Sequence, residues 1–66
     1  MEDINETRPL LTYEQAARAL GIKLNTLYSW VRDRKIPHVR LGDRLVRFDH
    51  AEIEKFVEDR RVAATR

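Results

Sequence analysis

The chain has no cysteine among its 66 residues, so neither a disulfide nor a thiolate metal ligand can brace the fold. Its two histidines, His38 and His50, stand apart without the spacing of a metal site. No apolar run approaches the roughly 20 residues needed to cross a bilayer. The first six residues are acidic where a secretory signal is basic. We therefore expect a soluble cytoplasmic protein that holds no metal or cofactor and does not enter a membrane.

Side chains arranged for catalysis are also lacking. Ser29 is the one serine, and no Gly-x-Ser-x-Gly turn surrounds it. The carboxylates of the C-terminal third are explained by ion pairing with Lys55 or Arg60 along a solvated helix. These carboxylates are Glu52, Glu54, Glu58 and Asp59. Because no candidate acid, base or nucleophile has a partner, we expect that the protein is not an enzyme.

Glycine and proline are scarce, with two of each, and they mark the ends of elements. Thr12 and Gln15 have the spacing of a capping box and predict a helix that starts after Thr12. Gly21 supplies the left-handed residue that ends this helix. A second helix is predicted from about Leu24 to Arg34, before Pro37. Its apolar stripe recurs with helical spacing at Leu24, Leu27, Tyr28 and Val31, widened by Trp30.

Two short β-rich arms, residues 38–41 and 44–48, surround a Gly42-Asp43 pair and predict a hairpin with a type II′ turn. In that register one face of the hairpin is apolar and points toward the helices, and the other face is cationic. The expected inward residues are Val39, Leu41, Val46 and Phe48, the expected outward residues are Arg40 and Arg47, and Arg44 lies beside the tip.

A third helix is predicted to follow Asp49 as N-cap, with Glu52 at the capping-box position. Its expected buried stripe is Ile53, Phe56 and Val57. The fold class is therefore mainly α with a small β-hairpin, that is, three helices plus a two-stranded wing in a winged helix-turn-helix. We expect a flexible lead over residues 1–9, one domain over residues 10–61 and a frayed tail over residues 62–66.

Positive charge collects in the middle of the chain. Residues 15–48 hold eight lysines or arginines against two aspartates, which gives +6, although the whole chain has only +2. Such a basic centre indicates a polyanionic partner, and the element order indicates double-stranded DNA. Tyr13, Tyr28 and Trp30 offer stacking surfaces for single-stranded bases, but their helical spacing favours packing at the core.

The second helix is the predicted reader of the major groove, and the hairpin is the predicted contact to the backbone or the minor groove. The alternatives are an ordinary solvated helix face and arginines that only protect an exposed strand edge. The DNA-binding residues expected on the helix are Lys23, Leu24, Asn25, Thr26, Tyr28, Ser29 and Arg32. Those expected on the wing are Arg40, Arg44 and Arg47.

Four runs of the chain carry a family resemblance. They are Leu11-Thr12-Tyr13-Glu14-Gln15-Ala16-Ala17, Leu20-Gly21-Ile22, Asn25-Thr26-Leu27-Tyr28 and Ile36-Pro37-His38-Val39-Arg40-Leu41-Gly42-Asp43-Arg44. They resemble the excisionase family of small winged helix-turn-helix proteins, which share the MerR-like DNA-binding fold. The resemblance covers about residues 10–58. It departs from the family at Lys23, where a serine-like cap is usual, and at Leu24, where a polar or basic residue is common.

The resemblance implies a phage recombination directionality factor. Such a protein binds attachment-site DNA, bends it and directs the phage integrase toward prophage excision in the cytoplasm of the bacterial host. It implies a monomer in solution, cooperative copies on DNA, and DNA contacts on the second helix and the wing.

Two other functions stay open. One is a small phage or MerR-like transcription regulator, although the chain shows no long dimerising helix after Val57. The other is a protein-interaction module that uses Leu10, Leu11 and Ala19 or the acidic third helix.

Overall fold

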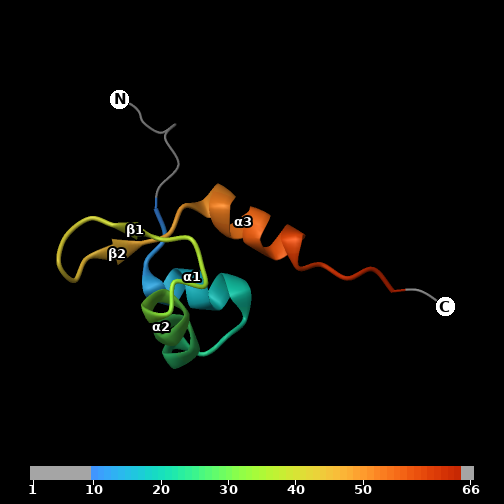
Figure 1. The fold of residues 1–66 in the computed structure, drawn as a ribbon, viewed down its shortest axis with the longest axis horizontal. Coiled ribbons are helices and arrows are strands. Elements are labelled where there is room, and N and C mark those ends of the chain that lie inside the picture. Colours follow the sequence, from blue (N-terminus) through green and yellow to red (C-terminus); the bar gives the residue numbers. More distant parts are fainter. Residues whose placement is uncertain (1–9, 65–66) are drawn as a thin grey trace.

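The computed structural model describes residues 10–64, so the lead predicted over residues 1–9 and the last two residues of the predicted tail lie outside the described residues. Three helices and one two-stranded antiparallel sheet form a winged helix-turn-helix, as predicted (Figure 1). In chain order the elements are α1 (Tyr13–Leu20), α2 (Leu24–Arg32), β1 (Val39–Arg40), β2 (Val46–Arg47) and α3 (His50–Asp59).

The ends of α1 follow from local chemistry, as the sequence predicts. The Gln15 backbone N–H donates to the Thr12 hydroxyl over 3.1 Å, and the Thr12 N–H donates to the Gln15 side chain over 2.9 Å. This reciprocal pair satisfies two donors that the first turn of a helix leaves open. Gly21 ends the helix with φ 68°, a left-handed conformation that glycine adopts without a steric penalty.

Helix α2 begins at Leu24 as predicted but ends at Arg32, two residues before the predicted end. Arg34 adopts φ 59°, which is incompatible with a continuing right-handed helix. The Lys35 N–H donates to the Trp30 carbonyl over 2.8 Å, and the Arg34 N–H donates to the Val31 carbonyl over 3.0 Å. These two bonds form a Schellman termination, with an arginine at the position where glycine is usual.

The hairpin forms, but its predicted register is wrong. Val39 pairs with Arg47 and Arg40 with Val46, and the Leu41 N–H donates to the Leu45 carbonyl over 2.7 Å. Three residues therefore connect the arms in place of two, and Gly42 lacks the positive φ that a type II′ turn requires. A slip of one residue moves each side chain of one arm to the other face.

The inward face of the hairpin consequently differs from the prediction. Val46 and Phe48 point inward and are buried, as predicted, and they share their face with Arg40. Leu41 and Leu45 lie on the other face, where they are 54% and 44% exposed, together with Arg47. Val39 pairs with Arg47, so it also lies on that face and is only half-buried. The predicted inward positions of Val39 and Leu41 and the predicted common face for Arg40 and Arg47 are therefore incorrect.

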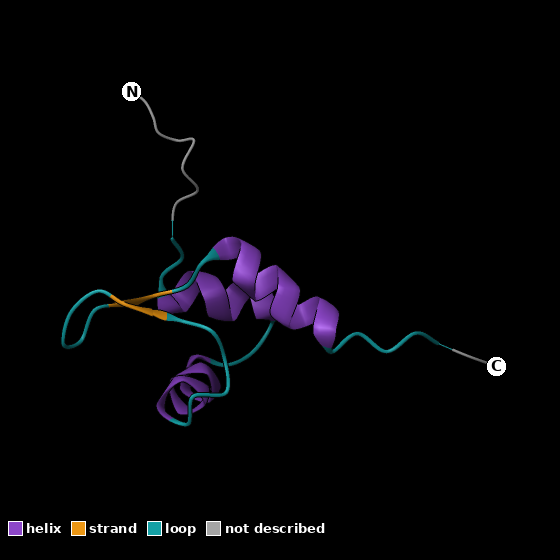
Figure 2. Ribbon diagram, turned by 45° about the horizontal axis from the view of Figure 1, so that its top comes forward, coloured by secondary structure: helices purple, strands orange, loops and turns teal. Residues whose placement is uncertain are grey.

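Helix α3 starts at the predicted cap, where the Asp49 carboxylate accepts from the Ala51 and Glu52 backbone N–H groups over 2.8 and 3.2 Å. Ile53 and Phe56 are buried as predicted, but Val57 is 36% exposed and lies outside the core. In Figure 2, α3 runs away from the hairpin toward the C-terminal end of the chain.

The core joins the three helices and β2 through a small set of apolar side chains. Phe48 and Leu27 are its largest fully enclosed members. No polar or charged residue is buried among the described residues, so the core is held by apolar packing. The buried residues are Ala16, Ala17, Leu27, Val31, Ile36, Val46, Phe48, Ile53 and Phe56.

The capping box at Thr12 gives a test of local stability. We expect Thr12→Ala to lower the free energy of unfolding by about 1 kcal/mol, because the first-turn amide loses its acceptor. Urea unfolding followed by circular dichroism measures this change. Thr12→Ser keeps the hydroxyl and should retain most of the stability. Equal losses in the two variants would show that the threonine methyl group, and not the cap, is responsible.

Candidate nucleic-acid interface

Helix α2 presents an exposed polar strip opposite its buried side. Leu27 and Val31 are buried in the core, whereas Asn25, Tyr28 and Arg32 are exposed. The three exposed positions recur at intervals of three and four residues, so they form one line along the helix. An amide, a phenol and a guanidinium in such a line can donate to and accept from base edges and phosphates.

Other predicted contact residues of α2 are less open. Thr26 and Ser29 are half-buried, and Leu24 packs against the core from its edge. The Arg32 guanidinium lies 3.2 Å from the Ser29 hydroxyl and 3.5 Å from the Asp33 carboxylate. Ser29 therefore holds the Arg32 side chain along the outer face of α2. In the free protein this arrangement makes Ser29 a positioning residue for Arg32.

The start of α2 has no side-chain cap. Lys23 occupies the N-cap position and makes no capping hydrogen bond, and Asn25 cannot cap the helix in its place because Asn25 lies inside the first turn. No acidic residue lies in that turn either. Free amide donors, the positive end of the helix dipole and the Lys23 ammonium thus meet at one end of the helix. This combination favours a phosphate.

An aromatic chain connects α2 to the wing. The ring centroids of Tyr28 and Tyr13 are 4.5 Å apart, and those of Tyr13 and Phe48 are 5.3 Å apart. Burial raises the pKa of the Tyr13 hydroxyl, Tyr28 adds to the rise, and the positive charge of Arg40 opposes it. The charge of Arg40 therefore acts on Tyr13, whose ring contacts Tyr28 of α2 on one side and Phe48 at the base of the hairpin on the other.

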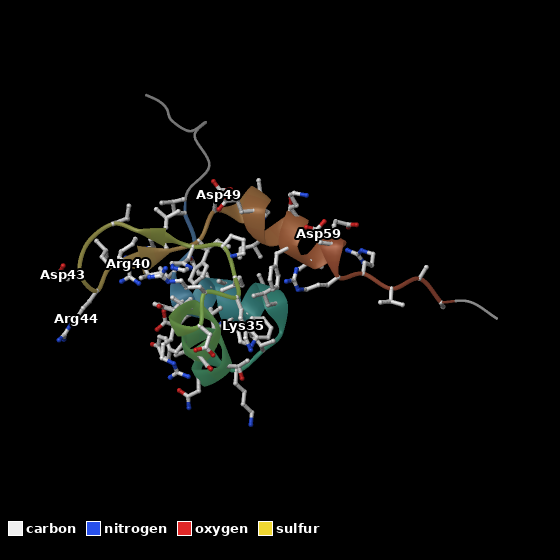
Figure 3. All side chains as sticks on the ribbon, in the orientation of Figure 1. Lys35, Arg40, Asp43, Arg44, Asp49 and Asp59 are labelled. Atoms are coloured by element: carbon white, nitrogen blue, oxygen red, sulfur yellow. The ribbon has the colours of Figure 1, made fainter. Side chains whose placement is uncertain are left out.

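The three wing arginines do not act from one face. Arg40 donates to the Asp43 carbonyl over 3.3 Å, and Arg44 extends from the tip of the hairpin (Figure 3). Arg47 lies on the opposite face of the ribbon, where its guanidinium donates to the Val46 carbonyl over 2.9 Å. Arg40 and Arg44 are thus the exposed cations of the wing, and Arg47 is half-buried.

Among the described residues, no group of three or more histidines, aspartates or glutamates is placed to hold a metal ion. In the same part of the chain, no helix has the length and apolar character needed to span a membrane.

An exposed polar helix face beside a cationic two-stranded wing defines a small DNA-binding protein of the winged helix-turn-helix class. The sequence family described as a helix-turn-helix domain matches residues 10–61, and the chain belongs to this family. No curated protein and no solved structure matches the chain.

The helical spacing predicts the exposed outer face of α2, but it does not predict the contacts that connect α2 to the wing. Tyr13 was expected only at the edge of the core, and its contacts to Tyr28 and Phe48 depend on the observed packing. Lys23 marks the basic start of α2 in the sequence. Its residue type indicates a poor N-cap, but it does not by itself indicate a phosphate-binding set of uncapped backbone amides.

The position of Arg40 can be tested through the Tyr13 hydroxyl. We expect Arg40→Ala to raise the Tyr13 pKa further, because the opposing positive charge is removed. Arg47→Ala, on the other face of the ribbon, should leave that pKa unchanged. An alkaline titration followed by the ring resonances of Tyr13 measures both variants.

The same shift has a consequence for stability. The pKa of Tyr13 is higher in the folded than in the unfolded protein. The contribution of Tyr13 to the free energy of unfolding is therefore fully present below the ordinary tyrosine pKa, and it is lost as the pH rises through the folded pKa. Equal changes of the Tyr13 pKa in Arg40→Ala and Arg47→Ala would contradict the observed register of the hairpin.

Proposed function

We propose that the protein is an excisionase, which binds and bends attachment-site DNA and directs a phage integrase toward prophage excision. The proposal is supported by the resemblance of residues 10–58 to that family and by the arrangement of α2 and the wing. The single observation that carries it is the pair of ring contacts from Tyr28 through Tyr13 to Phe48, which joins α2 to the base of the hairpin.

In the proposed complex the outer face of α2 enters the major groove. Asn25 hydrogen-bonds a base edge, with adenine as the partner that suits an amide, and Arg32 binds guanine or a phosphate. The open amides at the start of α2 and the Lys23 ammonium bind a phosphate at the groove edge. These contacts combine base reading with fixation of the register on the duplex.

The wing reaches the neighbouring minor groove in this arrangement. A narrow ribbon that enters a groove faces both of its walls, so Arg40 on one face and Arg47 on the other approach opposite strands. Arg44 at the tip reaches furthest along the groove. Narrow A·T-rich stretches attract arginines into the minor groove, and flexible pyrimidine–purine steps beside them let the duplex bend, which fits a protein whose task is to shape DNA.

An excision assay tests the functional proposal. Purified protein is added to the cognate integrase with DNA that carries either the two prophage-end sites or the two separate attachment sites. We expect recombination between the prophage ends to depend on the protein and integration to be suppressed by it. If the protein binds the region but leaves the direction of recombination unchanged, the excisionase role is wrong and transcriptional regulation becomes the better explanation.

Two variants separate phosphate contacts from base contacts. We expect Arg44→Ala to weaken binding to all DNA sequences and to reduce the salt dependence of log affinity by about one unit of slope. Asn25→Ala should cost about 1–3 kcal/mol on the specific site and much less on unrelated DNA. Fluorescence anisotropy over a range of salt concentrations measures both effects.

Arg61→Ala is the matched control for Arg44→Ala, because Arg61 lies beyond α3 and pairs with Glu58 over 2.9 Å. It should change neither affinity nor salt slope appreciably. If Asn25→Ala affected specific and unrelated DNA equally, α2 would not be the reading helix.

A further inference from the structure

A groove between the end of α2 and α3 is not used by the proposed DNA contacts. It consists of two adjoining surface hollows of ≈ 480 and ≈ 420 Å³, which share Lys35, Phe56 and Arg60 as lining residues. Trp30 lines one hollow, and Ile36 with Pro37 lines the other. Figure 3 shows Lys35 between α2 and α3, well away from Arg40 and Arg44 on the hairpin.

The groove has an apolar floor that is already packed. The Trp30 and Phe56 rings lie 5.9 Å apart at 50°, and the Arg60 guanidinium covers the Phe56 ring at 3.6 Å. Phe56 is only 8% exposed, so it does not offer an open ring face to a nucleic-acid base. Trp30 is only half-buried, so an aliphatic side chain can pack against it in the hollow that it lines.

The rim of the groove is cationic. Four basic residues line it against two carboxylates, and Asp59 already pairs with Lys55 over 3.6 Å. The side chains of Arg34 and Lys35 have no hydrogen-bond or ionic partner within residues 10–64 and are exposed. Charge complementarity therefore favours an anionic ligand at the Arg34–Lys35 end. The basic residues are Arg34, Lys35, Lys55 and Arg60, and the acidic ones are Glu52 and Asp59.

The backbone at Arg34 supplies an independent observation. Arg34 is the one described non-glycine residue with a positive φ, and it occupies the position of the α2 termination at which glycine is usual. A side chain there is strained. Arg34 lines the rim together with Lys35, and backbone strain of this kind is a local cost that functional positions carry.

We propose that this groove is a docking site for an acidic segment of a partner protein, with carboxylates on Arg34 and Lys35 and an aliphatic side chain beside Trp30. A concave apolar floor is unnecessary for a phosphate backbone but matches the way in which short peptide segments anchor a side chain. This surface is distinct from the α2 face and the wing, so the proposal stands or falls separately from DNA binding.

The full chain carries its own reporter, because Trp30 is the single tryptophan and lines the groove. The probe is a short peptide in which glutamates flank one leucine, and its control has glutamine in place of every glutamate. We expect a saturable change in Trp30 fluorescence with the acidic peptide, weakened by salt, and none with the control. Lys35→Ala should weaken peptide binding about tenfold, the usual cost of losing one charged hydrogen bond.

Two substitutions at Arg34 separate charge from backbone strain. Arg34→Gly and Arg34→Ala both remove the guanidinium, so both should weaken peptide binding about tenfold. Only glycine relieves the left-handed strain, so Arg34→Gly should melt at a higher temperature than Arg34→Ala. Arg18→Ala, which removes an exposed cation of α1, should leave peptide binding unchanged.

Several results would overturn the proposal. They are the absence of saturable peptide binding, equal binding of the glutamine peptide, and equal weakening by Arg18→Ala. Competitive displacement of the peptide by duplex DNA would assign the groove to the DNA interface. Self-association of the full chain that is lost in Lys35→Ala would assign the groove to a second copy of the protein.

Discussion

The pairing of Phe48 with Leu11 is the constraint on which the arrangement of the molecule depends. The Leu11 N–H donates to the Phe48 carbonyl over 2.7 Å, and the Phe48 N–H donates back to the Leu11 carbonyl over 2.9 Å. The Phe48 side chain is fully buried and its ring lies against Tyr13. One residue thus fixes the segment before α1, the base of the hairpin and the start of α3. In so small a core, few other contacts can replace it.

Most of the fold could be predicted from short-range chemistry. The Thr12 cap, the left-handed Gly21 and the Asp49 cap all act within a few residues, so the sequence alone locates these helix ends. The hairpin register could not be obtained in this way. Each arm alternates correctly by itself, but the pairing depends on the number of residues in the turn, and Gly42-Asp43 is compatible with a two-residue or a three-residue connection.

The candidate site was predictable to the extent that it lies on one helix. Helical spacing separates Asn25 and Arg32 from the buried Leu27, and the structure agrees. The arrangement of the wing is harder to predict, because the register, and not the residue type, decides on which face of the hairpin Arg40 and Arg47 lie. The early end of α2 was missed for a different reason. An arginine carries no sequence signal for a left-handed conformation, so Arg34 reads as a continuing helix.

The ring contacts from Tyr28 through Tyr13 to Phe48 pack α2 against the base of the hairpin. This packing sets the distance between α2 and the hairpin. The distance between successive grooves of a duplex, in contrast, changes with helical twist. In the proposed complex, α2 and the hairpin enter their grooves together only where the helical twist of the DNA matches the distance between these two elements. Overwinding or underwinding would therefore alter affinity without any change in base sequence, and the superhelical state of the DNA becomes part of what the protein recognises.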